Sequence, residues 1–99
     1  MKLLTKAIEA ALPKLGATDG TPLEQKKVVA KFFTPDSNWT WFVFEGEREE
    51  GEMIFFGMVH GFEKEMGYFS LNELETVTGP LGLHIERDLH CEGKTYGEI

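Results

Sequence analysis

The sequence predicts an α+β domain that contains a small, mostly antiparallel sheet of about five strands and two short helices. Eleven of the twelve aromatic residues lie between positions 32 and 69, and aromatic side chains favour strands. Helix start and stop signals occur on both sides of this region, and turn residues divide it into short segments. The predicted element order is therefore α-β-β-β-β-α-β, in one domain that spans residues 1–99.

The composition favours a globular protein of the cytoplasm. Hydrophobic residues make up 41% and charged residues 27% of the chain, values that disfavour wholesale disorder. A run of about 18 apolar residues, which could cross a bilayer, is missing, and the start at Met1 lacks the cleavage site of a secretory signal. The single cysteine, Cys91, rules out an internal disulfide and fits a reducing compartment. We therefore expect a cytoplasmic protein that makes no membrane contact.

A first helix is predicted over residues 5–12. The hydroxyl of Thr5 can cap the free N–H groups of the first turn, and Pro13 cannot continue the helix. Glycine, proline and polar residues make 16–27 a surface connection. The apolar positions of the helix follow the three-to-four-residue spacing of a buried face and are Leu4, Ile8, Ala11 and Leu12.

Four strands are predicted after this connection, and they are residues 28–34, 39–45, 53–60 and 66–69. Turn residues at 35–38 separate the first two strands, because proline fixes φ and the following polar side chains can bond their own backbone. The acidic stretch 46–51 is bracketed by two glycines and is predicted to be the tip of the next hairpin.

A second helix is predicted to begin at Ser70, because Ser70 and Glu73 have the spacing of a capping box. The dipeptide at 79–80, glycine followed by proline, ends this helix. A fifth extended segment is predicted over residues 83–89. The buried stripe of the helix is Leu71, Leu74 and Val77.

Both faces of the predicted sheet are apolar, unlike an antiparallel sheet with one face in water. Alternation along the second strand places Trp39, Trp41 and Val43 on one face and Phe42 and Phe44 on the other. Two short helices can cover one face, so three alternatives remain for the second: the sheet curls strongly around it, a homodimer covers it, or a partner protein does. Trp39 and Trp41 are the best anchor candidates, because tryptophan is enriched at the energetic centres of interfaces.

The net charge of −7 is unevenly distributed along the chain. Residues 1–31 contain six lysines and three acidic residues, whereas 32–99 contain four basic and fourteen acidic residues. Lysine and arginine are the main ligands of phosphate backbones, so the acidic portion disfavours a large nucleic-acid footprint. The acidic end of the second hairpin, 45–52, is predicted either to be a solvated tip or to dock a basic partner.

Candidate metal ligands are concentrated in residues 84–90. In an extended strand His84, Glu86, Asp88 and His90 share one face, and together with His60 they are weak candidates for metal binding. A straight strand spreads the four over about 20 Å, which is too far for convergence, so we expect a solvated edge strand. Arg87 would lie on the apolar side, where it requires a structural ion pair with a carboxylate or a bound anion.

The sequence leans against an enzyme. His90 and Cys91 are adjacent, so on a strand they would point to opposite faces and would not form a nucleophile–base pair. The glycines at 57 and 61 lack the spacing and the lysine of a phosphate-binding loop. We therefore predict no catalytic residue and no cofactor.

Four segments of the chain together resemble a known bacterial family, and they are residues 31–41, 55–61, 67–74 and 79–88. Their most specific parts read KFFTP, NWTW, FFGMVHG, GYFSLNEL, GPLGL and IERD. The family is the uncharacterised domain of unknown function 2958, whose members are often encoded on plasmids and other mobile elements. This resemblance covers nearly the whole chain and implies a bacterial cytoplasmic protein linked to such an element, but it assigns no role to any residue.

Three functions are consistent with these observations. The leading hypothesis is a non-enzymatic interaction module that binds a protein partner or a second copy of itself through the aromatic sheet face, with the acidic hairpin at its rim. The second is an acidic DNA mimic or decoy that acts on host defence or replication proteins, and the third is binding of single-stranded nucleic acid by tryptophan stacking. The predicted binding residues are Asn38, Trp39, Trp41, Glu47, Glu49, Glu50 and Arg87.

Overall fold

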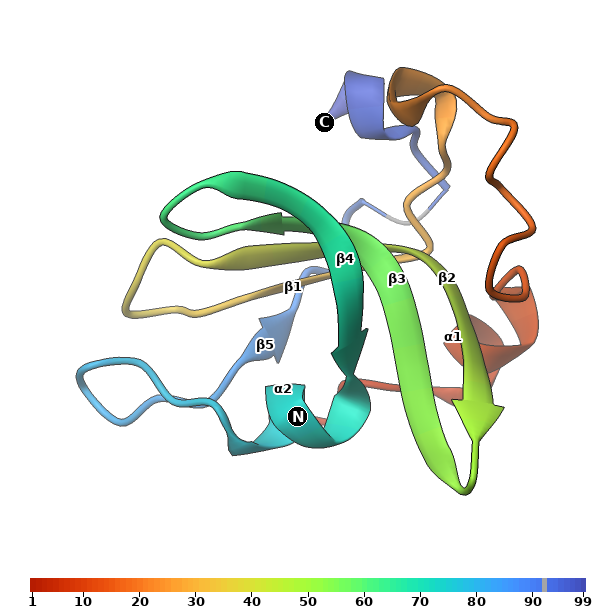
Figure 1. The fold of residues 1–99 in the computed structure, drawn as a ribbon. Coiled ribbons are helices and arrows are strands. Elements are labelled where there is room, and N and C mark those ends of the chain that lie inside the picture. The colour runs from red at the N-terminus through yellow and green to blue at the C-terminus, as the bar shows by residue number, and fades with distance from the viewer. Residues whose placement is uncertain (92) are drawn as a thin grey trace.

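A five-stranded antiparallel sheet is the main element of the fold, and the computed structural model describes it within residues 1–91 and 93–99 (Figure 1). The strands are arranged in the order β4-β3-β2-β1-β5, so β4 and β5 form the edges. The predicted α+β class and the element order are confirmed. The elements are α1 (Lys6–Ala11), η1 (Leu23–Gln25), β1 (Ala30–Phe33), β2 (Thr40–Glu49), β3 (Glu52–His60), β4 (Lys64–Ser70), α2 (Leu71–Thr76), β5 (Glu86–Arg87) and η2 (Tyr96–Glu98).

Both α-helices begin where a hydroxyl can cap them. The Thr5 side chain accepts a hydrogen bond from the N–H of Ile8 at 3.1 Å, and the Ser70 side chain accepts one from the N–H of Glu73 at 3.1 Å. Each helix has only six residues and buries a single side chain of its own, Ile8 in α1 and Leu74 in α2. Such short helices depend on tertiary packing for their stability.

The largest differences from the predicted boundaries concern two elements. Residues 46–51 are not all a hairpin tip: β2 continues through Glu49, and only Glu50 and Gly51 form the turn, with φ values of 51° and 83°. Positive φ at both central residues is typical of two-residue hairpins, which explains why the turn is so short. The segment predicted over 83–89 forms a strand only at β5, because β1, its partner, has four residues and pairs with β5 through Phe32 and Phe33.

The sheet carries a core on each face, and the predicted division of side chains between the faces is confirmed. On the first face, residues from β1, β2 and β3 pack with Ile8 of α1 and Leu74 of α2; the strand residues include Phe32, Trp41, Val43 and Phe55. On the second face, Cys91 and the partly buried Leu23 and Tyr96 pack with Val28, which precedes β1, and with the sheet residues Phe42, Phe44 and Met58.

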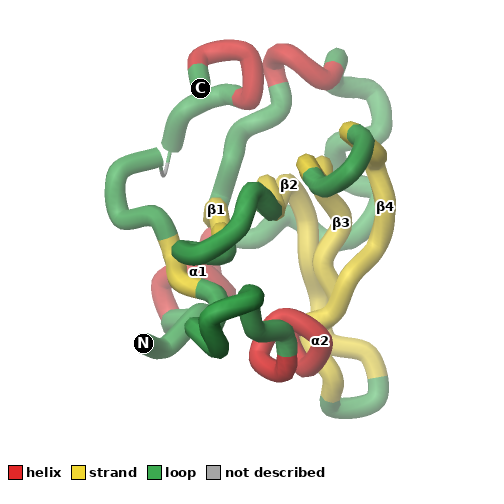
Figure 2. The backbone as a smooth tube through the Cα atoms, turned by 90° about the vertical axis from the view of Figure 1, so that its left-hand side faces the viewer, coloured by secondary structure: helices red, strands yellow, loops and turns green. Residues whose placement is uncertain are grey.

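Irregular segments, which the sequence did not identify as a cover, pack over part of the second face. The turns η1 and η2 lie side by side at the top of both views, while α1 and α2 lie lower, and β3 and β4 curve strongly (Figures 1 and 2). The ring of Tyr96 meets the rings of Phe42 and Phe44 edge-on, with centroid distances of 5.3 and 5.9 Å. The chain therefore covers much of the apolar surface that had been expected to need a curled sheet, a dimer or a partner.

A buried carboxylate attaches the connection between α1 and β1 to the sheet. Glu45 of β2 is 1% exposed and accepts hydrogen bonds from the N–H groups of Gly16 and Thr18, at 2.6 and 3.0 Å, and from the Thr18 hydroxyl. Lys26, which is also buried, donates to the Thr18 carbonyl. Burial by itself would raise the pKa of Glu45, but the hydrogen bonds from Thr18 and Gly16 and the charge of Lys26 lower the pKa below its usual value.

We expect Glu45 to make the free energy of unfolding depend on pH. A carboxyl group with a lowered pKa in the folded state stabilises the fold above its unfolded pKa of about 4.3, and this contribution disappears as the pH falls through the folded-state pKa. In urea unfolding, Glu45→Gln should lose about 1–3 kcal/mol at neutral pH and should show a weaker acid destabilisation than the wild type. Glu49→Gln, at an exposed position, is the control. Equal acid destabilisation of Glu45→Gln and wild type would contradict this assignment.

Two strand glycines should respond oppositely to the same substitution. A Cβ atom on Gly57 of β3 would overlap the Phe42 carbonyl group of β2, whereas a Cβ atom on Gly67 of β4 would have no heavy atom within 4 Å. We expect Gly57→Ala to lower the free energy of unfolding by about 2–4 kcal/mol through backbone displacement, and Gly67→Ala to change it by less than about 1 kcal/mol. Chemical denaturation measures both, and similar values for the two variants would show that the β2–β3 contact is looser than described.

Candidate functional site

Trp39 lies immediately before β2 and is only partly buried, unlike most large side chains of the sheet. Its indole stacks on that of Trp41, with a centroid distance of 5.9 Å and an interplanar angle of 27°. The rings of Phe62 and Trp39 meet edge-on at 5.4 Å and 80°, and Phe62 as a residue is 95% exposed. Trp41 is 7% exposed and belongs to the core on the first face. Of the two predicted anchors, only Trp39 is therefore accessible to solvent.

Gly61 allows this arrangement. A Cβ atom at this position would overlap the six-membered ring of Trp39, so the indole lies directly on the backbone of the turn between β3 and β4. Trp39 and Phe62 are thereby held at the same corner of the molecule, although they come from different turns.

Three hollows meet at Trp39. The first, of about 280 Å³, lies between the 34–41 segment and the loop after α2; its lining includes Trp41, Val77 and Pro80. The second, of about 400 Å³, contains the predicted residue Asn38 together with Lys31 and Asp88. The third, of about 350 Å³, is lined by Trp39, Val59, Phe62, Glu63 and Glu65. We call Trp39, Phe62 and the residues that line these hollows the Trp39 surface.

The wall of the first hollow is held by Asp36. Its carboxylate accepts hydrogen bonds from the N–H groups of Leu81 and Leu83, at 2.8 and 3.4 Å, which bonds the β1–β2 turn to the loop after α2. Gly79 lies so close to this carboxylate that a Cβ atom would overlap it. In Figures 1 and 2 the two loops and the β3–β4 turn lie on one side of the molecule, so the Trp39 surface is built from three connections at one end of the sheet.

The acidic hairpin is not part of this surface. Trp39 precedes β2 and the turn at Glu50 follows it, so a ten-residue strand separates them, and the hairpin lies on the other side of the molecule in Figure 1. Glu47 is partly buried and accepts a hydrogen bond from the N–H of Leu15 at 2.9 Å. Glu49 and Glu50 are exposed. The sequence had led us to expect these carboxylates at the rim of the aromatic residues. The structure instead places them at the other end of β2.

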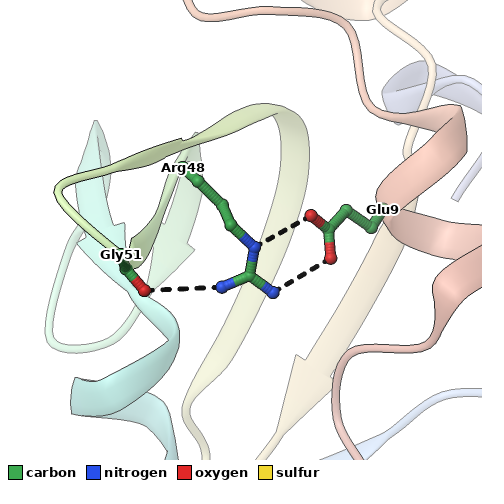
Figure 3. Close-up of polar contacts among 3 residues, drawn as sticks. All are labelled: Glu9, Arg48 and Gly51. Atoms are coloured by element: carbon green, nitrogen blue, oxygen red, sulfur yellow. Dashed lines mark hydrogen bonds and ion pairs between the residues drawn. The ribbon is translucent and has the colours of Figure 1, made fainter.

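An arginine bound to α1 reduces the negative charge of this hairpin. The Arg48 guanidinium donates from Nε and Nη2 to the two carboxylate oxygens of Glu9, at 2.9 and 3.0 Å (Figure 3). A third contact reaches the Gly51 carbonyl at 3.5 Å. The hydrogen bond from Arg48 lowers the pKa of Glu9, and the Glu9 carboxylate raises the pKa of Arg48.

Arg87 binds backbone carbonyl groups. Its guanidinium donates to the carbonyl oxygens of Lys2 and Leu3, the latter at 3.1 Å. Among the described residues the ion pairs are Lys31–Asp88 and Arg48–Glu9, so no carboxylate in that part of the chain forms the expected ion pair with Arg87. Carbonyl oxygens of the N-terminal segment take the place of the expected carboxylate, and Arg87 thereby fixes this segment beside β5.

The candidate metal ligands do not converge. Within residues 1–91 and 93–99 the structure has no group of three or more His, Cys, Asp or Glu side chains placed to hold a metal ion. His84, Glu86 and His90 are exposed, and Asp88 pairs with Lys31 at 3.6 Å. The segment is a strand only at β5, so the expected common face of four side chains does not form.

His60 has a partner that sequence reasoning missed. Its Nε2 atom is 2.7 Å from the hydroxyl oxygen of Tyr96, and its ring lies 4.8 Å from that of Phe42. Burial, with the charges of Lys64 and Lys31, lowers the pKa of His60, and burial with the charge of Glu24 raises the pKa of Tyr96. No sequence signal joins two residues 36 positions apart, because the contact depends on how η2 folds back over the sheet.

Comparison with known proteins identifies the family of the chain. The family model described as "Protein of unknown function (DUF2958)" matches residues 3–96. The chain belongs to this family. Searches of the curated proteins and of the solved structures found no match. The resemblance inferred from the four sequence segments is thereby confirmed.

The helices of this DUF2958 member are all short. In the part of the chain that the structure describes, none has the length and apolar character needed to cross a membrane.

The two tryptophans should differ in their access to solvent. We expect acrylamide to quench the fluorescence of Trp41→Phe, which retains Trp39, more strongly than that of Trp39→Phe, which retains the buried Trp41. Circular dichroism spectra that match the wild type will show that both variants are folded. Equal quenching of the two variants would contradict the placement of Trp39 at the surface.

Proposed function

We propose that this DUF2958 member is a non-enzymatic protein-interaction module that binds its partner through the Trp39 surface. The observation that carries the proposal is the Phe62 ring, which is 95% exposed and rests on a partly buried Trp39 where three hollows meet. A large ring exposed in this way has a solvation cost that a partner would remove.

The chemistry around Trp39 supports the proposal of a protein contact. Energetically important interface residues are enriched in tryptophan and lie among neutral contacts and a polar rim. Here the two rings are bordered by polar side chains, which include Ser37, Asn38 and Glu63. The hollows have volumes of about 280–400 Å³, which is enough space for side chains of a partner.

The other functions proposed from the sequence have less support at this surface. A single strand stacked on Trp39 would bring its phosphates near Glu63 and Glu65, which line the adjoining hollow and would repel them. A DNA mimic would use the exposed carboxylates of Glu49 and Glu50 at the far end of β2, away from Trp39. We therefore favour the protein-interaction module over these two functions.

We also propose, on the family resemblance, that this module acts in the bacterial cytoplasm for a mobile element.

Removing the Phe62 ring tests the module. Peptides would be selected from a random library displayed on phage by binding to the immobilised wild-type protein, and their dissociation constants would be measured in solution. We expect Phe62→Ala to weaken binding by about tenfold or more, as for a residue at the centre of an interface. The free energy of unfolding should be almost unchanged, because the ring is exposed.

Tyr68→Ala is the matched control for this test. The Tyr68 ring is 69% exposed and packs against Phe56, on the sheet face opposite Trp39. The Tyr68→Ala variant should bind the selected peptides with the same dissociation constants as the wild type. Peptides that bind Phe62→Ala and wild type equally would place the interaction elsewhere, and a library that yields no binding peptide would count against the module itself.

A further inference from the structure

The third hollow of the Trp39 surface combines two kinds of side chain that both attract cations. Aromatic rings are contributed by Trp39 and Phe62, and carboxylates by Glu63 and Glu65, around a hollow of about 350 Å³. The remaining lining residue is Val59, a partly buried neighbour of the core. We call this space the Phe62 hollow.

Strand alternation places the Glu65 side chain on the same sheet face as the Phe62 hollow and the Lys64 side chain on the opposite face. Glu65 of β4 pairs with Val59 of β3, so both belong to the face that carries Trp41. Lys64 pairs with His60 and therefore lies on the opposite face, where its charge acts on that imidazole.

The carboxylates of the Phe62 hollow have no basic partner within the described chain. The ion pairs among residues 1–91 and 93–99 are Lys31–Asp88 and Arg48–Glu9, and neither includes Glu63 or Glu65. The hollow thus presents negative charge that the protein does not neutralise with a side chain of its own. A positively charged partner group would be complementary to it.

The rings add a second, independent attraction for a cation. Trp39 stacks on Trp41 and contacts the Gly61 backbone, whereas Phe62 is 95% exposed and meets Trp39 nearly perpendicularly, at 80°, so Phe62 offers the more accessible aromatic face. The face of an aromatic ring is its electron-rich side and attracts ammonium and guanidinium groups. Guanidinium is planar and weakly hydrated, so it can stack on a ring while it donates two parallel hydrogen bonds to a carboxylate.

We propose that the Phe62 hollow binds an arginine side chain of the partner protein. The proposal rests on the protein-interaction function and names the group that this surface recognises. The guanidinium stacks on an aromatic ring and bonds to Glu63 or Glu65, while the aliphatic part of the arginine covers Val59. An anionic group is rejected by the same two carboxylates.

The test uses the full chain and a capped tripeptide, N-acetyl-Gly-Arg-Gly-amide, with the citrulline tripeptide as its neutral counterpart. Nuclear magnetic resonance follows the indole N–H signals of Trp39 and Trp41, which the Trp39→Phe variant assigns. We expect the arginine peptide to shift the Trp39 signal more than that of the buried Trp41, and the citrulline peptide to leave both almost unchanged. Phe62→Ala should weaken binding about three- to tenfold.

A pair of double variants separates a local site from general attraction to an acidic protein. Glu63→Gln with Glu65→Gln and Glu49→Gln with Glu50→Gln remove the same amount of charge, the first pair at the Phe62 hollow and the second at the hairpin. Only the first pair should weaken arginine binding, again about three- to tenfold. Equal weakening by both pairs, or equal shifts with arginine and citrulline, would overturn the proposal.

Three further outcomes are informative. A lysine tripeptide that binds as tightly as the arginine tripeptide would overturn the assignment to a guanidinium group. If library-selected peptides depend on Phe62 but the arginine tripeptide does not bind, the arginine site is wrong and the interaction module stands. If neither kind of peptide depends on Phe62, both proposals fail.

Discussion

A sheet with apolar side chains on both faces has to be covered twice, and this requirement organises the whole molecule. Two six-residue helices and the N-terminal segment cover the first face. The part of the second face around Phe42 and Phe44 is covered by η1, η2 and the irregular chain beside them, with Tyr96 packed on both rings. Irregular segments make few backbone hydrogen bonds to a sheet, so their buried N–H and C=O groups need side-chain partners. Glu45 and Lys26 are such partners, because they bond to the backbone of Gly16 and Thr18.

The Trp39 surface follows from the same requirement. The covering segments end before they reach the three connections at one end of the sheet, and the rings of Trp39 and Phe62 remain at that end. Tight packing beneath them, through Gly61 and the stack on Trp41, gives the exposed rings a rigid support. A rigid support reduces the entropy that a binding surface loses when a partner docks.

Local signals in the sequence were sufficient for the caps at Thr5 and Ser70 and for the division of the strands into two faces. They failed where a contact joins distant parts of the chain. Trp41 has the same strand parity as Trp39 but is buried, because depth depends on which segments pack above a strand. The exposure of Phe62 could not be predicted in this way, because the residue lies in a turn, where strand alternation does not apply.

The position of Tyr96 in the chain has a consequence for biosynthesis. A ribosome completes all strands of the sheet before it adds this residue, so the rings of Phe42 and Phe44 lack their edge-on neighbour for most of translation. Any folding intermediate that lacks η2 therefore exposes these two rings, and exposed aromatic surface makes an intermediate prone to aggregate.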